Sequence, residues 1–202
     1  MDIKKNYILE VNYDADISDS PRSWDPVGTL FMLGKFGKYT NLNEETEMDD
    51  YSELDDRDDI VVLPIYKYEH SGIALNTTGF SCPWDSCKVG YIYTTKENYK
   101  SHYRKDATDE EIKKCLTREI TQLHKYISGE VYRFELKSIS FVVIDGKEFN
   151  NEETEDQCSG FYDIEDIIAQ IPDDIKVSIF AGDLAEEAQR LYNVNRQESQ
   201  NE

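Results

Sequence analysis

The stretch from residue 68 to residue 93 holds the residue types that most often do chemistry. Its reactive and aromatic members include His70, Cys82, Trp84, Asp85 and Tyr93. An imidazole beside a carboxylate can act as a general base, and a thiolate beside an imidazole can act as a nucleophile. The same residues also suit a structured loop, in which Trp84 fills part of the core and Asp85 bonds backbone groups. Both interpretations stay open from the sequence alone.

One alternative for this stretch is an enzyme or a nucleotide-binding protein. Its site would lie around His70, Trp84 and Asp85, and its catalytic candidates would be His70, Asp85 and Tyr93. The run from His70-Ser71-Gly72 to Gly90-Tyr91-Ile92-Tyr93 resembles the His-Gly and Tyr elements of ADP-ribosyltransferases, with a serine inserted between the histidine and the glycine. That resemblance implies that these residues would bind a nicotinamide dinucleotide.

The cysteines are not spaced as metal ligands. Cys82 and Cys87 form one wide pair, and Cys115 and Cys158 stand alone. A structural zinc site needs two close Cys or His pairs, which the three scattered histidines do not complete. We therefore expect reduced thiols, no metal and no cofactor.

The overall charge excludes several classes of protein. The chain has 202 residues, with 42 acidic against 22 basic side chains and a net charge of −20. Hydrophobic residues make up 39%, enough for a core, and no run approaches the length of a membrane span. A strongly negative protein repels phosphate backbones and anionic lipids. We expect a cytoplasmic protein of a host cell that binds neither nucleic acid nor membrane directly.

Almost all of this charge lies in two acidic blocks. Residues 41–59 hold ten acids and one base, and residues 145–174 hold eleven acids and one base, whereas residues 88–137 have a net charge of +3. The expected partner-binding residues are the carboxylates Glu44, Glu45, Glu47, Asp49, Asp50, Glu53, Asp55, Asp56, Asp58, Asp59, Glu152, Glu153, Glu155 and Asp156. One interpretation is that the blocks are solvated loops. The other is that folding brings them together as a surface that imitates the phosphates of a duplex.

The hydrophobic pattern predicts an α+β fold with a mostly antiparallel sheet, one long amphipathic helix and two shorter C-terminal helices. The long helix is expected at 108–128, with a capping box of Thr108 and Glu111 and a terminating Gly129. A shorter helix is expected at 96–103, and the C-terminal helices at 163–171 and 183–192. Strands are expected at 7–13, 60–68, 73–77, 89–94, 131–136 and 139–144. The run at 28–34 fits a strand or a helix.

Three local features complete the expected fold. The first strand is placed at a sheet edge, a bulge or an edge is expected at Pro64, and a turn is expected at Lys137-Ser138. We expect a core domain at 1–144 with an acidic insertion at 41–59, an acidic helical extension at 145–192 and a flexible tail at 193–202.

Several strings look like small acidic proteins of unassigned function carried by bacteriophages and mobile elements. They lie at 19–30, at Tyr68-Glu69-His70-Ser71-Gly72, and at 80–86 with 89–93. The resemblance implies a phage setting, in which small acidic proteins often block host defences. By charge alone, the chain is similar to DNA-mimic antirestriction and anti-CRISPR proteins. The leading hypothesis is therefore a non-enzymatic inhibitor of a host nucleic-acid-binding protein or ribonucleoprotein complex, and a phage morphogenesis or housekeeping partner is a third option.

Overall fold

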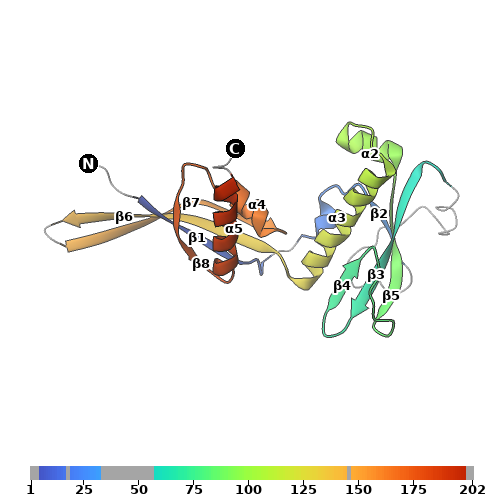
Figure 1. Ribbon diagram of the computed structural model, residues 1–202, viewed down its shortest axis with the longest axis horizontal. Coiled ribbons are helices and arrows are strands. Elements are labelled where there is room, and N and C mark those ends of the chain that lie inside the picture. Colours follow the sequence, from blue (N-terminus) through green and yellow to red (C-terminus); the bar gives the residue numbers. More distant parts are fainter. Residues whose placement is uncertain (1–4, 17–18, 33–56, 145–146, 199–202) are drawn as a thin grey trace. The chain divides into compact units, whose positions relative to one another are not determined.

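The chain folds into two compact units, and the computed structural model describes residues 5–16, 19–32, 57–144 and 147–198 (Figure 1). Unit 1 consists of Met1–Ser18 together with Gly129–Glu202, and unit 2 consists of Asp19–Ser128. The fold is α+β, as predicted, with one mostly antiparallel four-stranded sheet in each unit. The division differs from the expected boundary at residue 144, because unit 2 is inserted between two neighbouring strands of unit 1.

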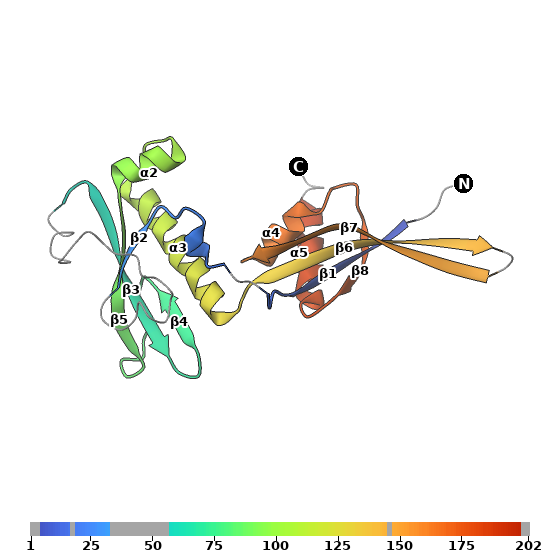
Figure 2. The same cartoon turned by 180° about the vertical axis from the view of Figure 1, so that it is seen from behind.

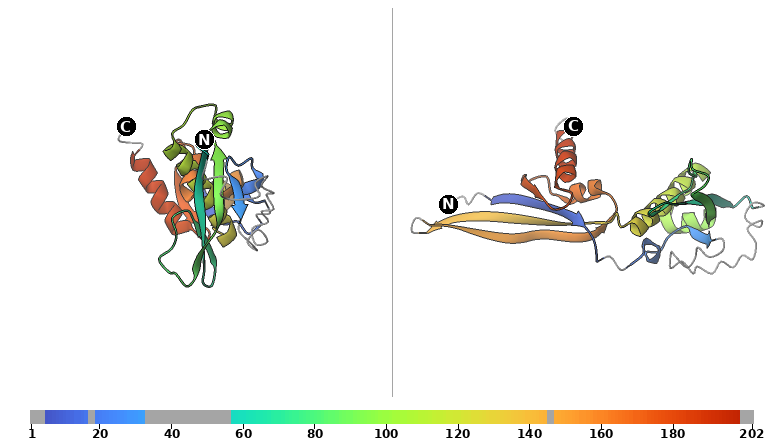
Figure 3. Two further views of the ribbon diagram at one scale, coloured as in Figure 1. Left: turned by 90° about the vertical axis from the view of Figure 1, so that its right-hand side faces the viewer. Right: turned by 90° about the horizontal axis from the view of Figure 1, so that it is seen from below.

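Unit 1 is a sheet of order β7-β6-β1-β8. Its elements are β1 (Lys5–Tyr13), β6 (Tyr132–Ile144), β7 (Lys147–Phe161), α4 (Ile164–Gln170), β8 (Val177–Ala181) and α5 (Ala185–Glu198). The strands pair antiparallel except β1 and β8, which are parallel. Both helices cover one face of the sheet (Figure 3).

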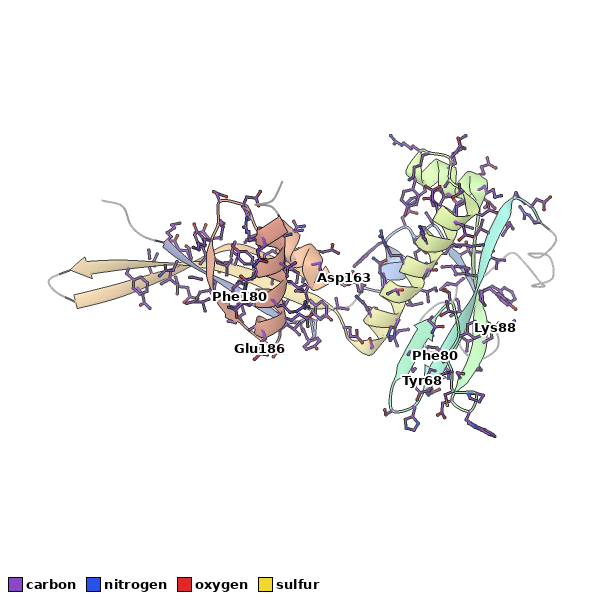
Figure 4. All side chains as sticks on the ribbon, viewed as in Figure 1. Tyr68, Phe80, Lys88, Asp163, Phe180 and Glu186 are labelled. Carbon is purple, nitrogen blue, oxygen red and sulfur yellow. The ribbon has the colours of Figure 1, made fainter. Side chains whose placement is uncertain are left out.

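The core of unit 1 lies between that face and the helices. Leu9 and Val11 of β1 and Ile167 of α4 are completely buried there. Phe180 of β8 points toward α5, where its ring lies 5.5 Å from the ring of Tyr192 (Figure 4). Along β1, the buried Leu9 and Val11 alternate with more exposed residues, as expected for a strand in a sheet with one covered face.

Unit 2 is a fully antiparallel sheet of order β2-β5-β3-β4, packed against the long helix. Its elements are η1 (Pro21–Ser23), β2 (Thr29–Met32), β3 (Ile60–Glu69), β4 (Ile73–Asn76), β5 (Ser86–Thr95), α2 (Lys96–Tyr103) and α3 (Asp109–Ser128). The ambiguous run at 28–34 contains strand β2. The buried side chains of α3 are Ile112, Leu116, Ile120 and Leu123, which follow the predicted helical spacing.

Local signals in unit 2 are confirmed. The Thr108 amide donates to Glu111 Oε2 at 2.8 Å and the Glu111 amide donates to Thr108 Oγ1 at 3.3 Å, which is the predicted capping box. Gly129 has a φ of +75°, the left-handed conformation that ends α3. Near Pro64, the register of β3 shifts between Ile65 and Tyr66, and β4 pairs only with Tyr66–Glu69. Pro64 lies beyond the part of β3 that pairs with β4, so its missing amide hydrogen breaks no hydrogen bond between these two strands.

The predictions for unit 1 need more correction. Strand β1 lies inside the sheet rather than at its edge, because the C-terminal strand β8, which the sequence analysis missed, pairs alongside it. Lys137-Ser138 is not a turn: β6 continues through it, since nine consecutive positions of β1 pair with β6 across it. The register shift at this point lies in the pairing with β7, where Glu155 has no paired residue on β6. Residues 147–161 form strand β7 instead of a helical extension, and β6 and β7 continue as a ribbon past the end of β1 (Figure 2).

The C-terminal helices are confirmed, although α5 reaches Glu198 and so includes residues expected in the flexible tail. Its last turns are held by Arg196, which bonds Asp173 Oδ1 at 2.7 Å and the Pro172 carbonyl at 2.7 Å. The dipeptide Asp145-Gly146, whose sequence is typical of a turn, lies outside the described residues.

Candidate functional site

Strand β7 presents the second acidic block as an extended row of exposed carboxylates. Glu152, Glu153, Glu155 and Asp156 are all exposed, and so is every residue from 151 to 159. β7 is the outermost strand of its sheet and pairs with β6 on one side only. Unit 1 as a whole holds 22 acidic and 8 basic residues, so 14 of the 20 net negative charges belong to it. We call Glu152, Glu153, Glu155 and Asp156 the β7 acidic row.

The open face of the same sheet adds carboxylates that the sequence analysis did not single out. Lys137 Nζ lies 3.1 Å from Glu10, 3.2 Å from Glu135 and 3.7 Å from Glu152. One ammonium thus lies beside three carboxylates, so the net charge of this part of the face is negative. The alternation of apolar and polar residues along β1 and β6 is the sequence signal that could have placed Glu10 and Glu135 on one face.

Hydrogen bonds and ion pairs keep these acids ionised. The amide of Asn12, and after it Lys137, lowers the pKa of Glu10. A hydrogen bond from Ser138, and after it the ion pair with Lys5 at 2.9 Å, lowers the pKa of Glu155. Both effects stabilise the charged form, so the surface remains anionic at neutral pH.

The first acidic block falls almost wholly outside the described residues. This applies to eight of its candidates, namely Glu44, Glu45, Glu47, Asp49, Asp50, Glu53, Asp55 and Asp56. Asp58 and Asp59 are described and exposed, and Arg57 forms two hydrogen bonds with the Asp59 carboxylate, at 2.9 and 2.6 Å. The two blocks belong to different units, and their convergence on one surface stays a prediction.

The enzymatic candidates are only partly brought together. His70 Nδ1 lies 3.7 Å from Asp85 Oδ2, too long for a hydrogen bond, and the His70 side chain is 71% exposed. Tyr93 pairs with Val62, seven residues along β5 from Ser86, which corresponds to roughly 23 Å of extended strand. His70 and Asp85 thus lie together at the tip of the sheet, and Tyr93 lies far from both.

Trp84 is not part of the core, contrary to the structural interpretation of its loop. Its side chain is 92% exposed, the highest value among the large hydrophobic residues that the structure describes. The loop around it is nevertheless ordered by hydrogen bonds, since the Glu69 amide donates to the Asp85 carbonyl at 2.9 Å and Ser86 Oγ donates to the Cys82 carbonyl. The rings of Tyr68 and Phe80 pack against each other with centroids 5.5 Å apart (Figure 4). An ordered loop that exposes a tryptophan suits a contact with another molecule.

All four cysteines lie within the described part of the chain. The four cysteines are free thiols, and Cys82 Sγ lies 3.5 Å from Asp85 Oδ2. Within the described ranges, no group of three His, Cys, Asp or Glu side chains could hold a metal ion. No helix in the described part of the chain is long and apolar enough to span a membrane.

Comparisons with known proteins do not indicate what the acidic surface of unit 1 binds. No protein family model, curated protein or solved structure matches this chain. The resemblance to phage and mobile-element proteins accordingly stays a prediction.

Proposed function

We propose that the protein is a non-enzymatic inhibitor that occupies the basic nucleic-acid groove of a host defence protein, of restriction or CRISPR type, with the β7 acidic row. The observation that supports this proposal is that four of the five residues from 152 to 156 are exposed acids on one edge strand. The phage setting comes from the sequence resemblance, and the partner class follows from charge complementarity.

The spacing of the β7 acidic row suits this role. An extended strand rises about 3.3 Å per residue, close to the roughly 3.4 Å rise per phosphate along one strand of B-DNA. Because successive side chains of a strand point to opposite faces, a groove that contacts one face of β7 meets about half of these charges, and a groove that follows the exposed edge can reach the acids of both faces. Such binding releases counterions and weakens steeply as salt increases.

An alternative role for acidic residues on an edge strand is purely protective. Charges on an exposed edge prevent other strands from pairing with it and so prevent aggregation. Under that interpretation the acids act only through their charge repulsion, and they do not compete with nucleic acid for the groove of a partner. The two interpretations differ in what happens when the carboxylates are replaced by amides.

The test is inhibition of DNA cleavage by a Type I restriction endonuclease and by a Cas9 ribonucleoprotein, measured over a salt series with the full chain. The variant E152Q/E153Q/E155Q/D156N removes the β7 acidic row. The control variant E165Q/D166N/D174N/E186Q changes the net charge equally at exposed positions on other elements of unit 1.

We expect the full chain and the control to inhibit at low salt, and the β7 variant to lose most of that inhibition. The affinity of the full chain should fall as salt increases, and that of the β7 variant should depend much less on salt, because the charge pairs that salt screens are gone. Equal inhibition by both variants, or inhibition that does not depend on salt, would contradict the role of β7. Absence of inhibition of both nucleases at low salt would contradict the proposed partner class.

A further inference from the structure

A hollow between α2 and α3 of unit 2 has an aromatic wall and a positively charged rim. It has a volume of 490 Å³, within the range of small-ligand sites. Its lining includes Tyr99 and Tyr103 of α2 together with Lys114 and Arg118 of α3, and Lys105 from the connection between the helices. A smaller hollow of 170 Å³ shares Tyr103, Glu119 and Gln122 with it and is also lined by Trp24 and His102.

The aromatic wall is fixed in position. The ring of Tyr103 lies 4.7 Å from that of Tyr99, which is buried in the core of unit 2. The Tyr103 hydroxyl lies 3.4 Å from Cys115 Sγ on α3. Tyr103 is still 45% exposed. The ring of His102 also lies 4.8 Å from that of Tyr103, at an angle of 66°. A ring held by Tyr99, His102 and Cys115 can offer its remaining exposed surface to a flat ligand without a loss of side-chain freedom.

Three cations rim the hollow, and none of them lies within ion-pair distance of an acid among the described residues. These are Lys105, Lys114 and Arg118, of which the last two are four residues apart on α3 and so lie on one stripe of that helix. After the hydrogen bonds from Thr108, the nearby charges of Lys105 and Lys114 also lower the pKa of Glu111. Other cations of the same helices are paired: Lys113 with Glu110 and Lys100 with Asp106, both at 2.9 Å.

The two acids that line the hollow are already engaged. Glu111 accepts the hydrogen bonds of the capping box from Thr108. Glu119 accepts from Arg22 at 2.6 Å and from the Val27 amide at 3.0 Å. Arg22 neutralises Glu119, so the three rim cations outweigh the one remaining acid, Glu111. This hollow is thus positive in a chain with a net charge of −20.

We propose that this hollow binds a nucleoside phosphate, with the base stacked on Tyr103 and the phosphate held by Lys114 and Arg118. Guanidinium and ammonium groups form charge-assisted hydrogen bonds with phosphate oxygens, and a purine ring stacks on an aromatic side chain. The site lies wholly in unit 2 and is independent of the β7 acidic row, so the failure of either proposal leaves the other intact.

The test is calorimetric titration of the full chain with three probes: adenosine monophosphate, adenosine and inorganic phosphate. The double variant K114Q/R118Q removes the phosphate contacts. The control double variant K100Q/K113Q removes the same charge from cations of the same helices that are already paired. Y103L removes the stacking surface, and Y103F keeps the ring as a check if Y103L fails to fold by circular dichroism.

We expect adenosine monophosphate to bind the full chain, the control and Y103F alike, and at least tenfold more tightly than either adenosine or inorganic phosphate. K114Q/R118Q should weaken it by roughly tenfold or more, as loss of charge-assisted bonds does, and Y103L should weaken it measurably. Equal affinity of K114Q/R118Q and K100Q/K113Q would overturn the proposal. So would equal binding of adenosine monophosphate and inorganic phosphate.

Discussion

Arg22 Nη1 donates to Glu119 Oε2 at 2.6 Å across 97 residues of chain, and the two side chains are only 5% and 14% exposed. The same carboxylate accepts from the backbone amides of Val27 and Gly28 at 3.0 and 3.1 Å. Glu119 therefore ties the segment around η1 to the middle of α3. A nearly buried carboxylate is tolerated here because all of these donors converge on it.

The substitution E119A should lower the free energy of unfolding by about 3 kcal/mol or more, because it leaves a buried guanidinium and two amides without their acceptor. R22M should cost less, since both amides still reach the carboxylate. Urea unfolding followed by circular dichroism measures both. E110A, at an exposed position of the same helix, is the control. An E119A variant as stable as E110A would show that the pair does not stabilise the unit.

Gly182 should tolerate no side chain. Its φ is +86°, and a Cβ would lie 2.4 Å from the Val11 carbonyl oxygen and 2.5 Å from Asn12 Oδ1. G182A should therefore lose about 1–3 kcal/mol from the backbone conformation alone, and more from the clash. G129A, with a φ of +75° in open space, should lose only the conformational part, and G72A should be nearly neutral. Any other order of the three unfolding midpoints would contradict this geometry.

Lys137 should stabilise unit 1 in a pH-dependent way. The folded pKa of Glu10 is lowered, so its contribution is present above its ordinary pKa of 4.5 and is lost as the pH falls through the folded value. Replacing Lys137 by Gln should cost about 1 kcal/mol at pH 7, the upper range for partly exposed pairs.

The cost of K137Q should shrink between pH 5 and pH 3, because protonated carboxylates no longer need the ammonium. Unfolding midpoints of the full chain and K137Q across this range measure the difference. K176Q, an exposed cation on the same unit, should show little cost at any pH. A cost of K137Q that stayed constant down to pH 3 would exclude the carboxylates as its cause.

Trp84 should contribute little to stability despite its size. Because its side chain is 92% exposed, W84A should change the free energy of unfolding by less than about 0.5 kcal/mol. In W24F, Trp84 is the remaining tryptophan of the two in the chain. Its emission should resemble that of tryptophan in water and be quenched readily by acrylamide. A blue-shifted, protected emission together with a large loss of stability in W84A would place Trp84 in the core.

The sequence by itself determined the elements whose signals are local. The capping box, the helical spacing of Ile112, Leu116, Ile120 and Leu123, and Gly129 predicted α3 almost to the residue. The β-branched and aromatic runs predicted β3 and β5. The charge count also located the second acidic block at residues 145–174 and a surplus of bases between residues 88 and 137, although it could not show the pocket that some of those bases surround.

Only the tertiary structure decided what residues 147–161 become. β7 is polar, and its residues from 151 to 159 are all exposed, so it has no hydrophobic alternation that a sequence pattern could detect. It is a strand because β6 supplies hydrogen-bonding partners along its length. In the same way, β8 makes β1 an interior strand, and pairing with β1 carries β6 through Lys137 and Ser138. Partners for hydrogen bonds come from distant residues, whereas caps and helical periods lie within a few residues of one another.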